Sequence, residues 1–162
     1  MEKRSIGSRV YEISEGYNIE QTKVKEIIQE FIVYCVRRLS FGERVDFLGL
    51  VSFIPDIELC SATTLAFKCY DLADNLGLPR YTVFCVVQEY ISSLRDELVK
   101  GNTIEIRGMV SMHPMLESGV VTKVHSRIST SIKANLLNYN TNVTSVRVHT
   151  HKLLKRRLSA GA

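Results

Sequence analysis

The sequence contains an internal repeat, because residues 6–55 match residues 65–114 at a constant offset of 59 with no gap. A repeat of this size is decisive for the fold, since it indicates two copies of one smaller unit. The identities gather near the end of each copy. The matched pairs are Gly42 and Gly101, Gly49 and Gly108, Val51 and Val110, Ser52 and Ser111, and Pro55 and Pro114. Upstream of the first glycine, the two copies share the spacing of apolar residues, which predicts a shared fold.

Each copy is predicted to form a short helix, a turn, a long helix and a β-hairpin. Apolar residues recur at i, i+3, i+4 and i+7 in the long helices, which is the helical period. Turns are expected at residues 15–18 and 75–78. The predicted helices cover about 5–14 and 20–39 in the first copy, and about 63–75 and 79–99 in the second.

Four glycines are expected to shape the turns of the two copies. Gly42 and Gly101 follow the long helices, where a left-handed residue commonly ends a helix. Gly49 and Gly108 each separate two short alternating stretches, as in a tight turn between strands. The sequence therefore predicts a strand–glycine–strand element at the end of each copy.

The second copy has a motif that resembles a known family. It reads Lys100-Gly101-Asn102-Thr103-Ile104-Glu105-Ile106-Arg107-Gly108-Met109-Val110-Ser111-Met112. Two helices followed by this element resemble the HU/IHF family of bacterial DNA-architectural proteins, and the turn at 75–78 is similar to that family's helix–helix turn. The resemblance covers about 130 residues. It implies an α+β fold of tandem HU/IHF-like units, each a helix–turn–helix followed by an antiparallel hairpin.

The two units are expected to differ in completeness. Residues 1–60 are expected to form unit one, which lacks an arm. Residues 61–140 are expected to form unit two, with a third strand and a short helix at 131–138. Residues 141–162 are expected to form a basic C-terminal strand and tail. Proteins of the HU/IHF family have a long β-arm whose apolar wedge kinks DNA. The hairpin of unit two is shorter, turns at 117–119 and has no proline near its tip, although Met115 and Leu116 are candidate wedges.

The charges are distributed unevenly along the chain. Residues 118–162 contain eight lysines and arginines and no aspartate or glutamate, although the whole chain has 21 basic and 17 acidic residues. The first 117 residues therefore carry a net charge of −4, and the remainder is strongly basic. This asymmetry is typical of a chain with a polyanionic or acidic partner.

The basic third of the chain contains the candidate binding residues. Residues 119–130 and 144–151 alternate between apolar and basic or polar side chains, as half-exposed strands do. The residues expected to contact nucleic-acid phosphates are Lys123, Arg127, Arg147, Lys152, Lys155, Arg156 and Arg157. The residues expected to dock on a partner are Leu153, Leu154 and Leu158. A solvated polar face for the strands and a frayed end for the tail remain open alternatives.

No pattern in the sequence predicts catalysis. It contains no glycine-rich phosphate loop, no nucleophile motif and no convergent pair of carboxylates, so no enzyme activity and no cofactor are expected. His149 and His151 are spaced to share a metal, but no third ligand is evident. Cys35, Cys69 and Cys85 fall in helical apolar patterns and are interpreted as small buried hydrophobes, with a disulfide or a catalytic thiol left open. No run of about 18 apolar residues and no signal peptide is present, which favours a soluble protein of a reducing compartment.

Two classes of function remain. The first is a non-enzymatic assembly protein on an HU/IHF-like fold: a homo-oligomer with other assembly proteins as partners, such as a neck or tail ring of a phage virion, in contact with double-stranded DNA. Tailed-phage structural gene sets include IHF-like proteins, which this chain resembles. The alternative is an architectural protein that binds DNA without sequence preference, in the bacterial cytoplasm or nucleoid. The armless unit one, the missing proline and the extended segments 56–62 and 140–151 favour assembly, because free strands can extend a neighbour's sheet.

Overall fold

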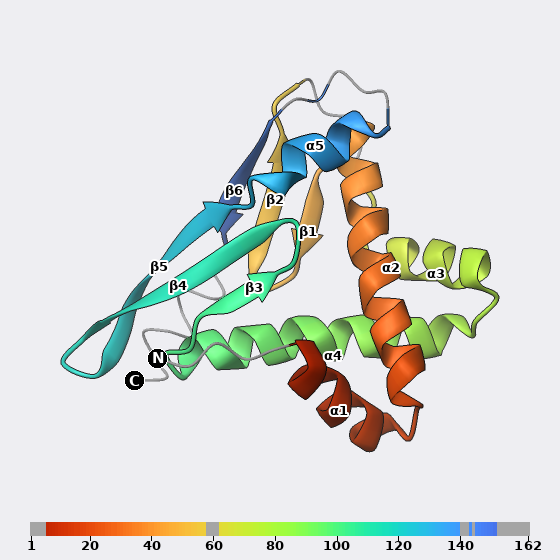
Figure 1. The fold of residues 1–162 in the computed structure, drawn as a ribbon, viewed down its shortest axis with the longest axis horizontal. Coiled ribbons are helices and arrows are strands. Elements are labelled where there is room, and N and C mark those ends of the chain that lie inside the picture. Colours follow the sequence, from red (N-terminus) through yellow and green to blue (C-terminus); the bar gives the residue numbers. More distant parts are fainter. Residues whose placement is uncertain (1–5, 58–61, 140–142, 144, 152–162) are drawn as a thin grey trace.

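The computed structural model describes residues 6–57, 62–139, 143 and 145–151, which form an α+β fold (Figure 1). The helices of this part are α1 (Ile6–Tyr17), α2 (Gln21–Ser40), α3 (Leu65–Leu76), α4 (Arg80–Val99) and α5 (Ser131–Leu137). The strands are β1 (Val45–Phe47), β2 (Val51–Pro55), β3 (Ile104–Ile106), β4 (Val110–Glu117), β5 (Val120–Ile128) and β6 (Val146–Thr150). The elements repeat in order, since α1, α2, β1 and β2 correspond to α3, α4, β3 and β4.

The four predicted helices of the repeat are confirmed, with one correction at the end of α1. A turn was expected at residues 15–18, but α1 continues through Gly16 to Tyr17, and Asn18 is the residue with left-handed backbone, at φ 54°. Its counterpart at the offset of 59 is Gly77, which ends α3 at φ 68°. Asparagine is one of the few residues other than glycine that tolerates this conformation. The four predicted turn glycines also have positive φ, at 83° for Gly42, 77° for Gly49, 94° for Gly101 and 82° for Gly108.

The strands form two antiparallel sheets of three strands each, in the orders β1-β2-β6 and β3-β4-β5. The expectation that only unit two has a third strand is therefore wrong. In unit one, β6 pairs with β2 along its whole length, from Val51 opposite Thr150 to Pro55 opposite Val146. The expectation that segment 140–151 is unpaired is wrong for residues 146–150, which pair with β2 along one edge, while residues 140–142 and 144 lie outside the described residues.

Unit two is inserted into unit one. The chain leaves unit one at the end of β2 and returns to it at the start of β6, so residues 146–151 belong with unit one rather than with a separate C-terminal segment. The two ends of the insertion are held side by side. The Asp56 backbone N–H donates to the Ser145 carbonyl at 3.0 Å, and the Ser145 hydroxyl donates to the Asp56 carboxylate at 3.2 Å.

The two units share one hydrophobic core, as their incomplete apolar faces predict. The long helices α2 and α4 cross each other, while α1 packs on α4 and α3 packs on α2, so each short helix contacts the long helix of the other unit (Figure 1). Phe31 of α2 and Tyr90 of α4 occupy matched positions in the repeat and are both buried. Polar contacts also join the units, since the Tyr34 hydroxyl donates to the Asp71 carboxylate at 2.6 Å. The chain is thus a pair of similar units packed as an intrachain dimer.

No helix in the described ranges is both long and apolar enough to span a membrane.

Candidate nucleic-acid interface

The exposed side chains of β5 and β6 form the candidate site. On β5, Lys123, His125 and Arg127 are exposed, while the alternate positions from Val124 onward are more buried. On β6, Arg147 and His149 are exposed in the same alternation. These five exposed side chains are called here the basic strand face. The basic strand face results from the alternation of side chains along a strand, because successive side chains point to opposite sides of a sheet.

The two strands of this face are structural counterparts. Val51 lies opposite Thr150 and the matched Val110 lies opposite Ile128, so a residue of β5 corresponds to the residue of β6 that is 22 positions later. Arg127 then corresponds to His149, and His125 corresponds to Arg147. The strands belong to different sheets but are in contact with each other (Figure 1). The two rows of exposed side chains therefore lie on strands that contact each other.

The cations of this face form no ion pair with the residues that the structure describes. Directly across the strands, Lys123 lies opposite Met115, Arg127 opposite Ser111, and Arg147 opposite Ile54. Between the residues that the structure describes, no ion pair involves Lys123, Arg127 or Arg147. By contrast, Arg38 is paired with Glu43 at 3.1 Å and Arg80 with Asp74 at 2.6 Å. Exposed cations without carboxylate partners are suited to an external anion.

Only part of the predicted site falls in the described residues. The structure brings Lys123, Arg127 and Arg147 to neighbouring strands. Outside the described residues lie Lys152, Lys155, Arg156, Arg157 and the three predicted docking leucines, Leu153, Leu154 and Leu158. His125 and His149 were not predicted as site residues, although the same alternation contained the signal for them.

The hairpin of β4 and β5 is a short arm. Its turn is at Ser118 and Gly119, with φ of 53° and 80°, and two left-handed residues make the tight turn that suits a twisted hairpin. Met115 and Leu116, the candidate wedges, are 53% and 45% exposed, and the strand register shifts between them. The Leu116 side chain packs near Gly101, where an added Cβ would lie 3.6 Å away. Met115 is therefore the more accessible of the two.

A polar cluster fixes the end of β6 to the outer side of the unit-one sheet. The Gly49 N–H donates to His151 Nδ1 at 3.1 Å, and His151 Nε2 lies 2.5 Å from Ser52 Oγ. Ser52 Oγ in turn donates to Asp46 Oδ1 at 2.5 Å. Because Nδ1 accepts a hydrogen bond, the neutral ring carries its proton on Nε2 and donates it to Ser52. Burial lowers the pKa of His151, which favours this neutral form.

The same cluster contains the residue types of a catalytic triad in an arrangement that does not suit catalysis. In a triad, histidine lies between the acid and serine and accepts the serine proton. Here Ser52 lies between Asp46 and His151, and the Nε2 that would act as base carries the ring proton. Ser52 is also only 3% exposed. The cluster therefore holds β6 in place.

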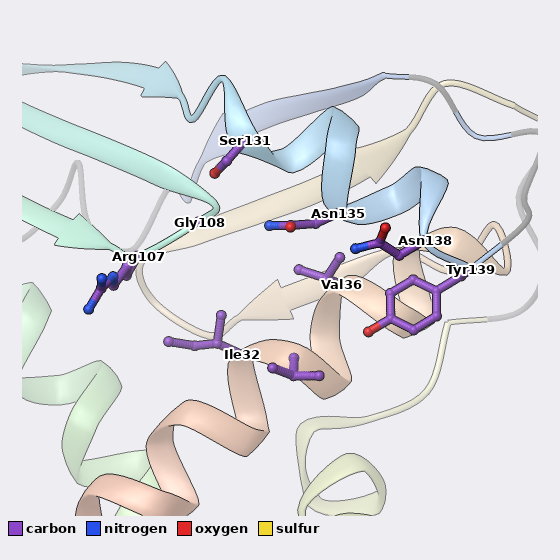
Figure 2. Close-up of a pocket in the computed structure, with 9 residues that line it drawn as sticks. Ile32, Val36, Arg107, Gly108, Ser131, Asn135, Asn138 and Tyr139 are labelled. Carbon is purple, nitrogen blue, oxygen red and sulfur yellow. The ribbon is translucent and has the colours of Figure 1, made fainter.

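A cavity of about 440 Å³ lies between α2, the β3–β4 turn and α5 (Figure 2). Its apolar wall comes from Ile32, Val33 and Val36 of α2. Polar side chains from the turn and from the region of α5 line the other sides: Arg107, Ser131, Asn135, Asn138 and Tyr139. Among the described residues that line it, the titratable side chains are Arg107 and Tyr139.

The interpretation of the cysteines as buried hydrophobes is confirmed for three of them. Cys35, Cys69 and Cys85 are buried and free. Burial raises the pKa of Cys69 to about 12 and that of Cys35 well above its ordinary range, so both thiols stay protonated. Cys60 lies outside the described residues. Lys68, beside Cys35, is also buried, and its ammonium donates to the Thr63 carbonyl at 2.5 Å and hydroxyl at 2.9 Å.

Comparison with known proteins identified no relative. No family model matches the sequence, and no curated protein and no solved structure matches it significantly. The resemblance to the HU/IHF family therefore stays a prediction from the internal repeat and the strand–glycine–strand motif of the sequence.

Proposed function

We propose that the chain binds double-stranded DNA through its phosphates, using the basic strand face, and does so without reading base sequence. The observation that carries this proposal is the proximity of β5 and β6, which places Lys123, Arg127 and Arg147 on neighbouring strands. Within the described part of the chain, these three side chains form no ion pair with a carboxylate. Cations repeated along extended strands suit the repeated charge of a phosphate backbone.

The kind of contact follows from the geometry of the side chains. Lysine and arginine on a sheet surface donate to phosphate oxygens, which position a protein on DNA but carry no sequence information. Base reading requires donors held in a groove by a helix or a ribbon. The four helices of the repeat use their apolar faces in the shared core, and the arm is short. The accessible Met115 side chain of this arm is suited to widening a groove, because a methionine side chain makes no base-specific hydrogen bonds.

Completion of unit one strengthens the DNA-binding interpretation against the assembly interpretation. Unit one was expected to lack a third strand, and residues 140–151 were expected to be free to extend a neighbour's sheet. Since β6 pairs with β2 inside the chain, unit one has a third strand, and residues 146–150 have one edge paired, not two, within their sheet. Two similar units that share a core and each have a third strand support the alternative of a DNA-architectural protein, which the resemblance to the HU/IHF family implies.

Fluorescence anisotropy with labelled 30-base-pair duplexes of two unrelated sequences tests the proposal. We expect both duplexes to bind with equal affinity, and log affinity to fall linearly with log salt. Replacement of Lys123, Arg127 or Arg147 by alanine should weaken binding and reduce the salt slope by about 0.9 for each phosphate that is no longer neutralised. Lys25→Ala, an exposed lysine on α2, is the matched control and should change neither quantity. No binding at low salt, or strong preference for one duplex, contradicts the proposal.

A second function, assembly with protein partners, is favoured by exposed aromatic residues on the helical side of the molecule. Phe67 and Tyr70 of α3 and Tyr81 of α4 are 50%, 37% and 77% exposed, and α3 lies across α2 from the sheets (Figure 1). Aromatic side chains are enriched in protein interfaces. The partner would be a second copy of the chain or another component of a virion ring. Light scattering of the purified protein with and without duplex DNA separates the two functions, since assembly predicts an oligomer without DNA.

A further inference from the structure

The polar cluster that holds β6 in unit one has a counterpart in unit two, in which serine takes the place of histidine. Three cluster positions are matched by the offset of 59: Asp46 with Glu105, Gly49 with Gly108, and Ser52 with Ser111. The strand offset of 22 matches His151 with Ser129. The His151 N–H donates to the Leu50 carbonyl at 3.0 Å. The Ser129 N–H donates to the matched Met109 carbonyl at 2.9 Å, so the two backbones agree at this position.

A cavity of about 400 Å³ lies beside the matched residues of unit two. Its lining includes the counterparts of all four cluster residues, which are Glu105, Gly108, Ser111 and Ser129. The Ser129 hydroxyl is engaged with the start of α5, because it accepts from the Ser131 N–H at 3.3 Å and lies 2.8 Å from the Ser131 hydroxyl. Serine is also much smaller than histidine. The position that an imidazole ring fills in unit one is therefore open in unit two.

Two groups that hold the imidazole ring in unit one have no such partner in unit two. In unit one, the Gly49 N–H donates to His151 Nδ1 at 3.1 Å, and Ser52 Oγ lies 2.5 Å from Nε2 of the same ring. The matched Gly108 N–H and Ser111 hydroxyl form no hydrogen bond with another residue in the described part of the chain. A backbone N–H and a hydroxyl beside a cavity are available to a ligand that offers an acceptor and a donor.

The charged residues around the cavity indicate where an anionic group of a ligand lies. Arg127, which corresponds to His149 of unit one, lines the cavity together with His113. In the strand register, Ser111 lies between Glu105 on one side and Arg127 on the other. Arg127 forms no ion pair with the residues that the structure describes. An anion on the Arg127 side therefore gains a charge-assisted hydrogen bond and lies away from the carboxylate.

We propose that this cavity binds a small molecule that has an imidazole-type ring and an anionic substituent. One ring nitrogen accepts from the Gly108 N–H, a donor on the ligand binds the Ser111 hydroxyl, and the anionic group meets Arg127. The proposal does not rest on DNA binding, because the precedent for the ring is the His151 side chain of unit one. Imidazole carboxylates and adenine nucleotides share this chemistry, since adenine has an N7 acceptor next to an amino donor.

Two-dimensional proton–nitrogen NMR of the full chain tests the proposal, at about pH 8 so that imidazole rings are neutral. The probes are imidazolylacetate, adenosine monophosphate and histamine. Histamine has the same ring as imidazolylacetate but a cationic side group, so it is the matched control for charge. We expect imidazolylacetate to shift the Gly108 amide with a dissociation constant of about 1–10 mM. Histamine should bind at least about threefold more weakly. The tighter of the two anionic probes identifies the ligand class.

Three variants locate the binding. Ser129→His should abolish it, because this change places in the cavity of unit two the imidazole that unit one already has. Ser129→Ala is the matched control, since it removes the hydroxyl but leaves the cavity open, and it should retain binding. Ser111→Ala should weaken binding about fivefold, because the ligand loses its hydrogen-bond acceptor.

Three outcomes contradict the proposal. The first is an unchanged Gly108 amide with both anionic probes at tens of millimolar. The second is a shift that persists in Ser129→His, which would place binding outside the cavity. The third is equal affinity for imidazolylacetate and histamine, which would show that Arg127 does not select an anion.

Discussion

Unit one and unit two have the same arrangement of helices and strands but different chain connectivity. Unit two is continuous from α3 to α5, whereas unit one is interrupted after β2 and receives its third strand from residues 146–150. The register of β6 on β2 nevertheless matches that of β5 on β4. The comparison shows that a third strand can take the same register on its partner strand without being continuous with it in sequence.

The interruption explains why the described residues form an arm in unit two and none in unit one. In unit two, β4 and β5 have eight and nine residues and are joined by a two-residue turn. In unit one, β2 and β6 have only five residues each, because the chain leaves the sheet where an arm would begin. The insertion of unit two therefore accounts for the absence of an arm between β2 and β6 as well. A DNA duplex on the basic strand face would meet a hairpin on one side only.

The ends of the long helices show how side chains diverged while the backbone stayed the same. The Glu43 N–H donates to the Arg38 carbonyl at 3.2 Å, and the matched Asn102 N–H donates to the Glu97 carbonyl at 2.9 Å. The side chains of each pair also interact, as an ion pair in unit one and as an amide–carboxylate hydrogen bond of 2.6 Å in unit two. The acidic residue is the later one of the pair in unit one, Glu43, and the earlier one in unit two, Glu97. The two side chains interact in both units.

Separating the units should produce the largest effect. Residues 62–145 contain a complete unit with its third strand and α5, but its α3 and α4 lose the apolar surface of α1 and α2. We expect this fragment to form a homodimer in which a second copy takes the place of unit one, since helices with uncovered apolar faces associate. Size-exclusion chromatography with light scattering and circular dichroism checks this result. Residues 1–57, which lack β6, are the control and should be unfolded. A folded monomer of either fragment would show that the units do not need each other.

The repeat made most of the fold predictable from sequence. Helical periodicity and the four glycines located α1 to α4 and the first two strands of each unit, and alternation located β5. The pairing of β6 was not predictable, because a five-residue alternating strand does not indicate which distant strand it joins. The end of α1 was misplaced because Gly16 was interpreted as a turn residue. The match of Asn18 to Gly77 contained the correct signal.

The candidate site was predictable only where it depends on strand alternation. Lys123, Arg127 and Arg147 follow directly from the basic alternate positions. The cluster of Asp46, Ser52 and His151 was not predicted, because it joins β1, β2 and the end of β6 and requires the tertiary fold. The exposed histidines of the face were visible in the alternation but had no separate chemical signature.

Alanine at the matched turn glycines should show a smaller, unequal effect. Both Gly49 and Gly108 have left-handed backbone, which costs about 1–2 kcal/mol for alanine. Gly49→Ala should cost about 1 kcal/mol more than Gly108→Ala, because the new methyl group displaces Arg95 from Leu48. Urea unfolding measures both. Gly16→Ala is the control with the opposite sign, since Gly16 is helical with open space around it and alanine there should stabilise by about 0.5–1 kcal/mol. Equal losses at the two turns would mean that Arg95 contributes nothing to unit one.

The smallest expected effect is a pH dependence that comes from His151, whose counterpart in unit two is Ser129. Burial lowers the pKa of His151 in the folded chain; Asp46 opposes this shift and Arg44 adds to it. In the unfolded chain the pKa is about 6.5. As pH falls from about 6.5 through the lower folded pKa, the unfolded state binds more protons, so the free energy of unfolding decreases. The structural cause is that a protonated Nδ1 no longer accepts a hydrogen bond from the Gly49 N–H and instead repels it.

We expect the free energy of unfolding of the wild-type chain to fall by about 1 kcal/mol between pH 7 and pH 5. The His151→Asn variant should not show this decrease, because the asparagine oxygen accepts the same hydrogen bond without titrating. Urea unfolding at both pH values measures the difference. The Asp46 carboxylate stays ionised over this range, because the range lies above the lowered pKa of Asp46. Equal pH dependence of the two proteins would show that the hydrogen bond to His151 does not hold β6 in place.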